Sequence, residues 1–222
     1  PYGAAEEKIF AHAYKRHTYR WPMIVYMEHL DRATLEDVEN FFKTFYVPNN
    51  ATLVIAGDID PRQIRKVVEK YFASIPGGKN SIPRVSIVEG LQRSEKREVV
   101  PDNVQLPAIF IAYRMPEEGN PDFYPLVLIS NVLASGESSR LYHNLVYKKK
   151  IAQDVEASVV AMEEPGLFLM TATAIHGYTA DTLEVEIDRE LESLRGDSIS
   201  AKVLEKVKNQ IESSMTFGKQ RV

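Results

Sequence analysis

Any catalytic chemistry in this sequence has to draw on few kinds of side chain. The 222 residues include no cysteine, so thiol nucleophiles, disulfides and Cys-ligated zinc are excluded. The histidines that remain are His12, His17, His29, His143 and His176. A metal site would therefore combine these histidines with carboxylates.

The pair Glu28-His29 is the most suggestive local feature. Inverted zinc motifs have the form H-x-x-E-H on a helix, in which two histidines hold the metal and the glutamate acts as base. The first letter of that motif falls on Val25. Because one histidine alone does not hold a metal, we interpret Glu28-His29 as a surface or turn pair.

The other histidines do not complete a site either. His12 and His17 are five residues apart, so they do not share a helix face, and we expect both to be solvated. His143 follows a tyrosine on a predicted helix, and His176 lies at the end of a predicted strand. Neither has a sequence neighbour that assigns it a role.

The serines at 138–139 raise the question of a nucleophile. No His–Asp constellation is readable around them, and a helix N-cap accounts for a serine at this place. The segment 135–140 also lacks the glycine spacing and the lysine of a phosphate-binding loop. The residues alone therefore predict no complete active site.

The composition is that of an ordinary globular chain. The hydrophobic fraction is 44% and the charged fraction 26%, which excludes a disordered chain. The net charge of −4 argues against a nucleic-acid-binding protein. The longest apolar runs, at 52–57 and 108–112, are too short to span a bilayer. We expect a soluble protein.

The first third of the chain predicts helices around one strand. A helix is expected over 4–15 and a loop over 16–27. Thr34 followed by Asp37 forms a capping-box pattern that opens a helix over 34–46. The apolar run 51–59 predicts a buried strand, and Asp60-Pro61 predicts the start of another helix. Residues 77–104 form a connection, of which 95–100 could already be a strand.

The rest of the chain predicts an alternation of strands and helices. Strands are expected at 108–115, 154–162 and 167–175, the last two as a hairpin around the Pro-Gly turn at 163–166. Helices are expected at 122–134, 139–150, 180–195 and 201–215. The predicted fold class is α/β of the α+β type, with helices packed on mixed sheets.

Several stretches, in this order along the chain, resemble the insulinase/pitrilysin family of zinc metallopeptidases, particularly its shorter bacterial members related to mitochondrial processing peptidase. The most specific are Y-x-P-N-N-A-T-L-V-I-A-G-D at 46–58 and the later S-S-R-L-Y at 138–142. The others lie at 19–24, 71–78, 105–116 and 165–168.

The resemblance implies two tandem, similar domains of which the first is truncated here. Residues 1–76 would end the zinc-type domain, 77–104 would hold the linker and a first strand region, and 105–222 would form most of the second domain. The family holds zinc with two histidines of H-x-x-E-H and a later glutamate. By resemblance these ligands precede residue 1, so we expect no metal ligand and no catalytic residue in this chain.

The resemblance also implies an arginine and a tyrosine in the second domain that bind substrate and stabilise the developing oxyanion. An ungapped placement puts them on Val146 and Gln153, which cannot do that work. In some bacterial pairs a zinc-less partner subunit supplies the Arg/Tyr pair. Val146 and Gln153 fit the zinc-bearing member of such a pair, and a dimer is expected.

The resulting expectation is a fragment of a zinc endopeptidase that cleaves peptides or unfolded segments in a clamshell chamber, inactive by itself, from the bacterial cytoplasm or periplasm. Two alternatives stay open. One is a non-catalytic structural or activating subunit of the same family. The other is an interaction module whose edge strand pairs with an extended peptide.

Overall fold

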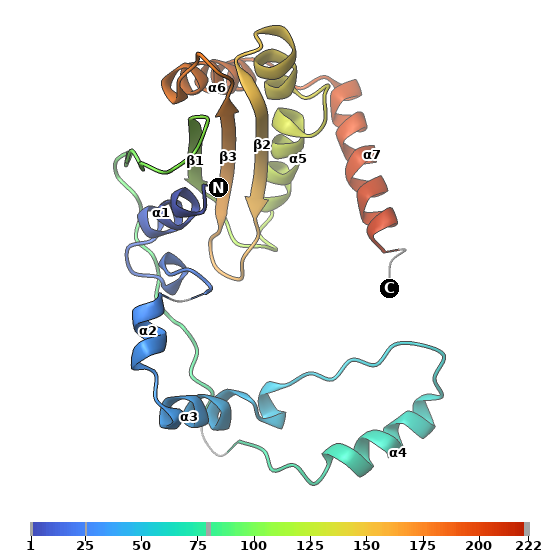
Figure 1. Cartoon of the computed structure of the whole chain (residues 1–222). Helices are drawn as coiled ribbons and strands as arrows, with labels where there is room; N and C mark the ends of the chain where they lie inside the picture. Colours follow the sequence, from blue (N-terminus) through green and yellow to red (C-terminus); the bar gives the residue numbers. More distant parts are fainter. Residues whose placement is uncertain (1, 25, 79–80, 220–222) are drawn as a thin grey trace. The chain divides into compact units, whose positions relative to one another are not determined.

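The computed structural model of the chain describes residues 2–24, 26–78 and 81–219. It contains two compact units (Figure 1). Unit 1 comprises residues 1–21 and 89–222, and unit 2 comprises residues 22–88. Each unit is described by itself below.

Unit 1 is built on a three-stranded antiparallel sheet in the order β1-β3-β2 (Figure 1). The strands are β1 (Ala108–Arg114), β2 (Ala152–Val160) and β3 (Leu167–Ala174). β2 and β3 form the predicted hairpin, which is confirmed. The described strands are all antiparallel, so the prediction of a mixed sheet is wrong for this part of the chain.

Helices cover one face of this sheet. They are α5 (Phe123–Ala134), the π-helical η3 (Tyr142–Lys148) and α6 (Ala180–Gly196), and α7 (Ala201–Gly218) packs against α5. Alternate residues of β3, Phe168, Met170 and Ala172, point toward them, as the period of two in a strand requires. The core forms where these residues meet fully buried side chains of the helices: Leu133, Leu141, Leu145, Leu183 and Ile187.

In the part of the chain that the structure describes, α1 (Gly3–Ala13) lies against the opposite face of the sheet, near one end. Ala13 and Tyr14 form a second, smaller core with Leu167, the first residue of β3. The short 3₁₀ turn η1 (Thr18–Arg20) follows. The remainder of this face, toward β2, is left open.

Unit 2 contains α2 (Met27–Arg32), α3 (Leu35–Phe45), the 3₁₀ turn η2 (Pro48–Asn50) and α4 (Pro61–Phe72). The predicted starts of α3 and α4 are confirmed. The Thr34 side chain accepts from the Asp37 N–H in a capping box, and Asp60 accepts from the N–H of Arg62. No described residue of unit 2 is buried.

Two strand predictions and one loop prediction are wrong. Residues 51–56 are extended but pair with no described strand, and Val54 is 81% exposed. A strand requires hydrogen bonds to a neighbour, and the described chain supplies none there. Residues 95–100 are likewise unpaired. The predicted loop at 16–27 contains η1 and the first residue of α2.

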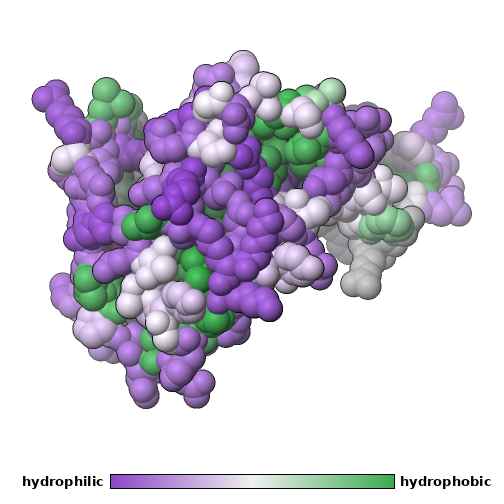
Figure 2. All heavy atoms as spheres, turned by 90° about the horizontal axis from the view of Figure 1, so that it is seen from above, coloured by the Kyte–Doolittle hydropathy of each residue, from purple (hydrophilic) through white to green (hydrophobic). Residues whose placement is uncertain are grey.

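The surface combines polar side chains with exposed large hydrophobic ones, such as Phe41 and Phe42. On the face drawn in Figure 2, hydrophilic side chains surround separate hydrophobic patches. None of the helices in the described ranges is both long and apolar enough to cross a membrane.

Candidate functional site

The segment from η3 to the start of β2 carries both predicted substrate positions. Val146 lies in η3, is partly buried and packs against the core. Gln153 is exposed and lies at an irregularity of β2, between the paired residues Ala152 and Asp154. The structure therefore brings the two positions onto neighbouring elements, with Gln153 exposed and Val146 partly buried.

The predicted helix at 139–150 has π geometry over most of its length. The Lys149 N–H donates to the Asn144 carbonyl oxygen at 2.9 Å, a bond that spans five residues. π-helical turns are rare and frequently occur at functional sites. The apolar pattern predicts only a helix here, because seven residues are too short a window to distinguish a π-helix from an α-helix.

Carboxylates of α6 hold η3 in place. Glu190 accepts hydrogen bonds from Asn144 and from Arg140, the latter at 3.3 Å. Glu186 pairs with Lys149 at the end of η3 and with Arg189 of its own helix. The hydrogen bond from Lys149 lowers the pKa of Glu186, which keeps the carboxylate ionised and the π-helical segment fixed against α6.

The turn from η3 into β2 passes through Lys150, whose φ is 51°. This left-handed conformation favours glycine, because a Cβ crowds the following carbonyl group. The turn lets the chain reverse from η3 into β2, so that Asp154 and Glu156 reach the open face of the sheet, whereas Val155 points into the core.

A groove of about 410 Å³ lies on that open face. Its floor is formed by alternate strand residues, among them Phe110 of β1, Thr171 and Thr173 of β3, and its walls by Asp154 and Glu156 of β2. Tyr2 and Glu6 close the side formed by α1. The Thr173 hydroxyl donates to Asp154 at 3.1 Å.

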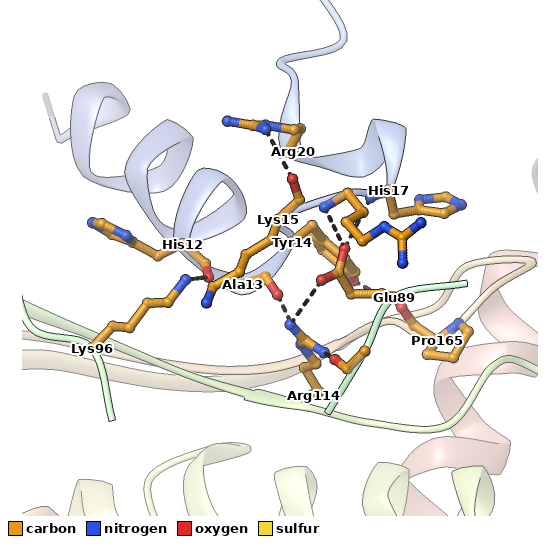
Figure 3. Close-up of polar contacts among 12 residues, drawn as sticks. His12, Ala13, Tyr14, Lys15, His17, Arg20, Glu89, Lys96, Arg114 and Pro165 are labelled. Carbon is orange, nitrogen blue, oxygen red and sulfur yellow. Dashed lines mark hydrogen bonds and ion pairs between the residues drawn. The ribbon is translucent and has the colours of Figure 1, made fainter. Parts of the chain in front are cut away.

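A second polar cluster, drawn in Figure 3, fastens the end of α1 to the sheet. Glu89 accepts from the backbone N–H groups of Arg16 and His17 at 2.7 and 2.9 Å. Arg114, the last residue of β1, donates to the Ala13 carbonyl oxygen at 2.8 Å and pairs with Glu89 at 3.5 Å. These contacts join three separate parts of the sequence.

The charges of this cluster follow from its hydrogen bonds. Burial raises the pKa of Glu89, but the backbone N–H groups and Arg114 outweigh burial and lower that pKa to about 2. Burial raises the pKa of Tyr14 to about 12, and its hydroxyl donates to the Pro165 carbonyl oxygen at 2.8 Å. Near neutral pH, the Glu89 carboxylate is therefore ionised and the Tyr14 hydroxyl is neutral, so neither contact changes its charge.

One histidine, His17, is buried where the sequence predicted a solvated side chain. His12 is accessible and pairs with Glu98 at 2.5 Å, whereas His17 is only 4% exposed. The prediction that His17 is solvated is wrong, because Tyr14 and Tyr19 enclose its ring. His29 lies 3.8 Å from the Glu28 carboxylate, and Val25 lies outside the described residues.

Zinc is the metal that the resemblance implies, and the described residues do not fit it. Across 2–24, 26–78 and 81–219, no three side chains of the His, Cys, Asp or Glu type come close enough to hold a metal ion. Pairs such as His12–Glu98 supply two ligands at most. No chemical step can be derived through zinc from this chain.

The comparison with known families decides the classification. The family model described as "Peptidase M16 inactive domain" matches residues 32–211, which is most of the chain. The chain belongs to this family. The match includes η3, the open-faced sheet and the extended segment at 51–56, so the recognition made from the sequence motifs is confirmed.

Curated relatives carry names of zinc proteases. "Zinc protease PqqE" of Helicobacter pylori is 29% identical over 94% of this chain and 47% of its own length. "Uncharacterized zinc protease YmxG" of Bacillus subtilis is 25% identical over 91% of this chain and 48% of its own length. The chain thus spans about half the length of these relatives.

Solved structures share the fold. A protease from Helicobacter pylori is similar with a TM-score of 0.90 and 28% identity, over 97% of this chain and 53% of that one. A peptidase M16 inactive domain from Pseudomonas fluorescens is similar with a TM-score of 0.78 and 18% identity, over 95% of this chain and 50% of that one. The predicted class of helices packed on a sheet is confirmed.

Proposed function

We propose that this chain is the non-catalytic portion of a zinc-dependent metalloendopeptidase that hydrolyses peptide bonds in peptides or unfolded segments. The observation that carries the proposal is the match of residues 32–211 to the M16 inactive domain. The names of the zinc protease relatives support the activity of the parent protein. In this proposal zinc belongs to the parent protein, and the chain is inactive alone.

The domain assignment is part of the same proposal. Residues 1–76 belong to the zinc-type domain, 77–104 to the linker and 105–222 to the second domain of a clamshell chamber. The extended, unpaired residues 51–56 and the exposed apolar faces of α3 and α4 support this assignment, because apolar surface of this extent calls for a cover.

A partner subunit completes the proposed site. Val146 has no hydrogen-bond donor in its side chain, and it is partly buried against the core. Gln153 is exposed but lacks a phenol. A partner that carries an arginine and a tyrosine at these places would supply the substrate contacts, and the parent would supply the zinc.

The proposal is tested with the parent protein, expressed from its whole reading frame alone and together with a zinc-less family member from the same genome. Cleavage of a quenched fluorescent peptide is measured. We expect activity from the pair, loss of it with a chelator and its return with zinc. A pair that lacks activity in every combination would contradict the proposal and favour the structural or activating subunit.

A double variant tests the role of the two positions. Val146→Arg with Gln153→Tyr in the parent is expected to reduce its dependence on the partner. Val146→Arg with Gln153→Phe is the matched control, because it has the same substitution at position 146 and the same ring at position 153 without the hydroxyl group. Equal partner dependence of both variants would contradict the assignment of Gln153.

A further inference from the structure

The groove on the open face of the sheet has charge of one sign only. Its ionisable carboxylates are Glu6, Asp154 and Glu156, and none of its lining residues is a lysine, arginine or histidine. Leu169 and Thr171 of β3 lie beside these carboxylates and offer surface for an aliphatic chain. The lining therefore matches a cationic group at the end of a flexible apolar stem.

The strand that carries two of these carboxylates lies at the edge of the sheet. In the part of the chain that the structure describes, β2 pairs with β3 and with no other strand (Figure 1). Edge strands are often protected by charged side chains, proline or bulges. β2 contains no lysine or proline, and its protection consists of the acidic Asp154 and Glu156 and the irregularity at its start. Its outer backbone groups can pair with an added strand.

The spacing of the β2 side chains sets what such a strand would carry. Asp154, Glu156 and Ser158 lie opposite Thr173, Thr171 and Leu169 and share the open face. Same-face residues of a strand recur about every 6.6–6.8 Å. An added strand presents its own alternate side chains to this face with the same repeat.

We propose that the groove and the free edge of β2 bind an extended peptide segment with lysine or arginine at alternate positions. The proposal rests on the proposed function and names the class of substrate segment that this domain holds. Backbone hydrogen bonds to β2 give affinity, and cross-strand pairs with Asp154 and Glu156 select the basic side chains.

The same charges disfavour a second copy of this chain as the occupant. Pairing of two β2 edges would bring Asp154 and Glu156 of one copy beside those of the other, and like charges on neighbouring strands are destabilising. A basic segment would instead place positive side chains beside Asp154 and Glu156, which is a favourable pairing. The edge is therefore selective for a partner of opposite charge.

Fluorescence polarisation on the full chain tests the proposal, with the labelled peptide Thr-Lys-Thr-Lys-Thr-Lys-Thr as probe. The acidic counterpart with Glu for Lys and the isomer Thr-Thr-Lys-Lys-Lys-Thr-Thr are compared with it. We expect the alternating basic peptide to bind tightest, the acidic one not to bind, and the isomer to bind at least twofold more weakly.

Variants locate the binding. Asp154→Asn with Glu156→Gln is expected to weaken binding of the alternating peptide roughly threefold to tenfold. Glu205→Gln with Glu212→Gln on α7 has the same change in net charge, lies outside the groove and is expected to leave the affinity unchanged. Circular dichroism checks that both variants fold like the original chain.

Equal affinity for the alternating and the acidic peptide, an equal effect of the two double variants, or no binding at all would overturn the proposal. Because this assay needs neither zinc nor cleavage, its result is separate from that of the peptidase assay. If the parent cleaves peptides but this chain does not bind the basic peptide, the proposed function stands and the proposed binding by the groove is wrong.

Discussion

Unit 1 and unit 2 both contain helices with a clear apolar stripe, but the two units differ in what those stripes pack against. In unit 1, Leu183 and Ile187 of α6 are fully buried against the sheet. In unit 2, α3 has an equally clear apolar stripe, yet Phe41 and Phe42 are 57% and 58% exposed. The difference shows that local signals suffice to form a helix, whereas a core needs a paired sheet to complete it.

The largest expected effect comes from the core of unit 1. Leu183→Ala removes a fully buried side chain from α6 and is expected to lower the free energy of unfolding by about 2–5 kcal/mol. Leu35→Ala in α3 is the matched change at a residue that is 75% exposed, and it is expected to cost less than about 0.5 kcal/mol. Urea unfolding measures both, and equal losses would break the comparison.

The ion pairs of the two units predict the next effect. Glu89→Gln weakens the buried tie to Arg114 and the backbone, and is expected to destabilise by about 1.5–3 kcal/mol. Glu39→Gln in α3 breaks an exposed pair with Lys43 and is expected to change the free energy of unfolding by less than about 1 kcal/mol. A comparable loss from Glu39→Gln in urea unfolding would contradict this distinction.

The pH dependence of the free energy of unfolding gives a second test of the role of Glu89. The pKa of Glu89 is about 2 in the folded chain against an ordinary value of 4.5. Its charge therefore stabilises the fold fully above about pH 4.5, and that contribution is lost as the pH falls toward 2. Glu89→Gln should flatten the decline of stability in this window, and an unchanged decline measured by urea unfolding at each pH would refute the role of Glu89.

Matched helix caps give a smaller effect. Thr179 caps α6 and Thr34 caps α3, each through a side-chain bond to a backbone N–H three residues on. Thr179→Ala is expected to lower the free energy of unfolding by about 1 kcal/mol. Thr34→Ala should reduce helical circular dichroism without a matching shift in the unfolding midpoint. A full shift from Thr34→Ala would mean that α3 shares the core of unit 1.

The smallest effect concerns the turn before β2. Lys150→Gly relieves a left-handed backbone conformation and is expected to stabilise the chain by about 0.5–1 kcal/mol. Lys150→Ala is the control, because it removes the same charge and keeps the Cβ. If both variants change the thermal unfolding midpoint equally, the backbone explanation is wrong.

Local sequence signals predicted most elements. The Pro-Gly turn marked the β2–β3 hairpin, and Thr34 and Asp60 marked helix starts that the structure confirms. The apolar run at 51–59 has the composition of a strand, but pairing depends on a neighbour and cannot be read from the run itself.

The candidate site was harder to predict. Gln153 and Val146 came from a resemblance, and their roles remain predictions. The tie between Glu89 and the backbone of Arg16 and His17 joins positions more than 70 residues apart, so no local pattern announces it. The groove likewise depends on which strand residues share a face, which becomes known only once the register is fixed.

The measurement that tests the central claim most directly is a peptidase assay on the purified 222-residue chain, with added zinc and with a chelator. Because the proposed catalytic metal lies outside this chain, we expect no cleavage that zinc restores or a chelator abolishes. Chelator-sensitive cleavage by the pure chain would contradict it.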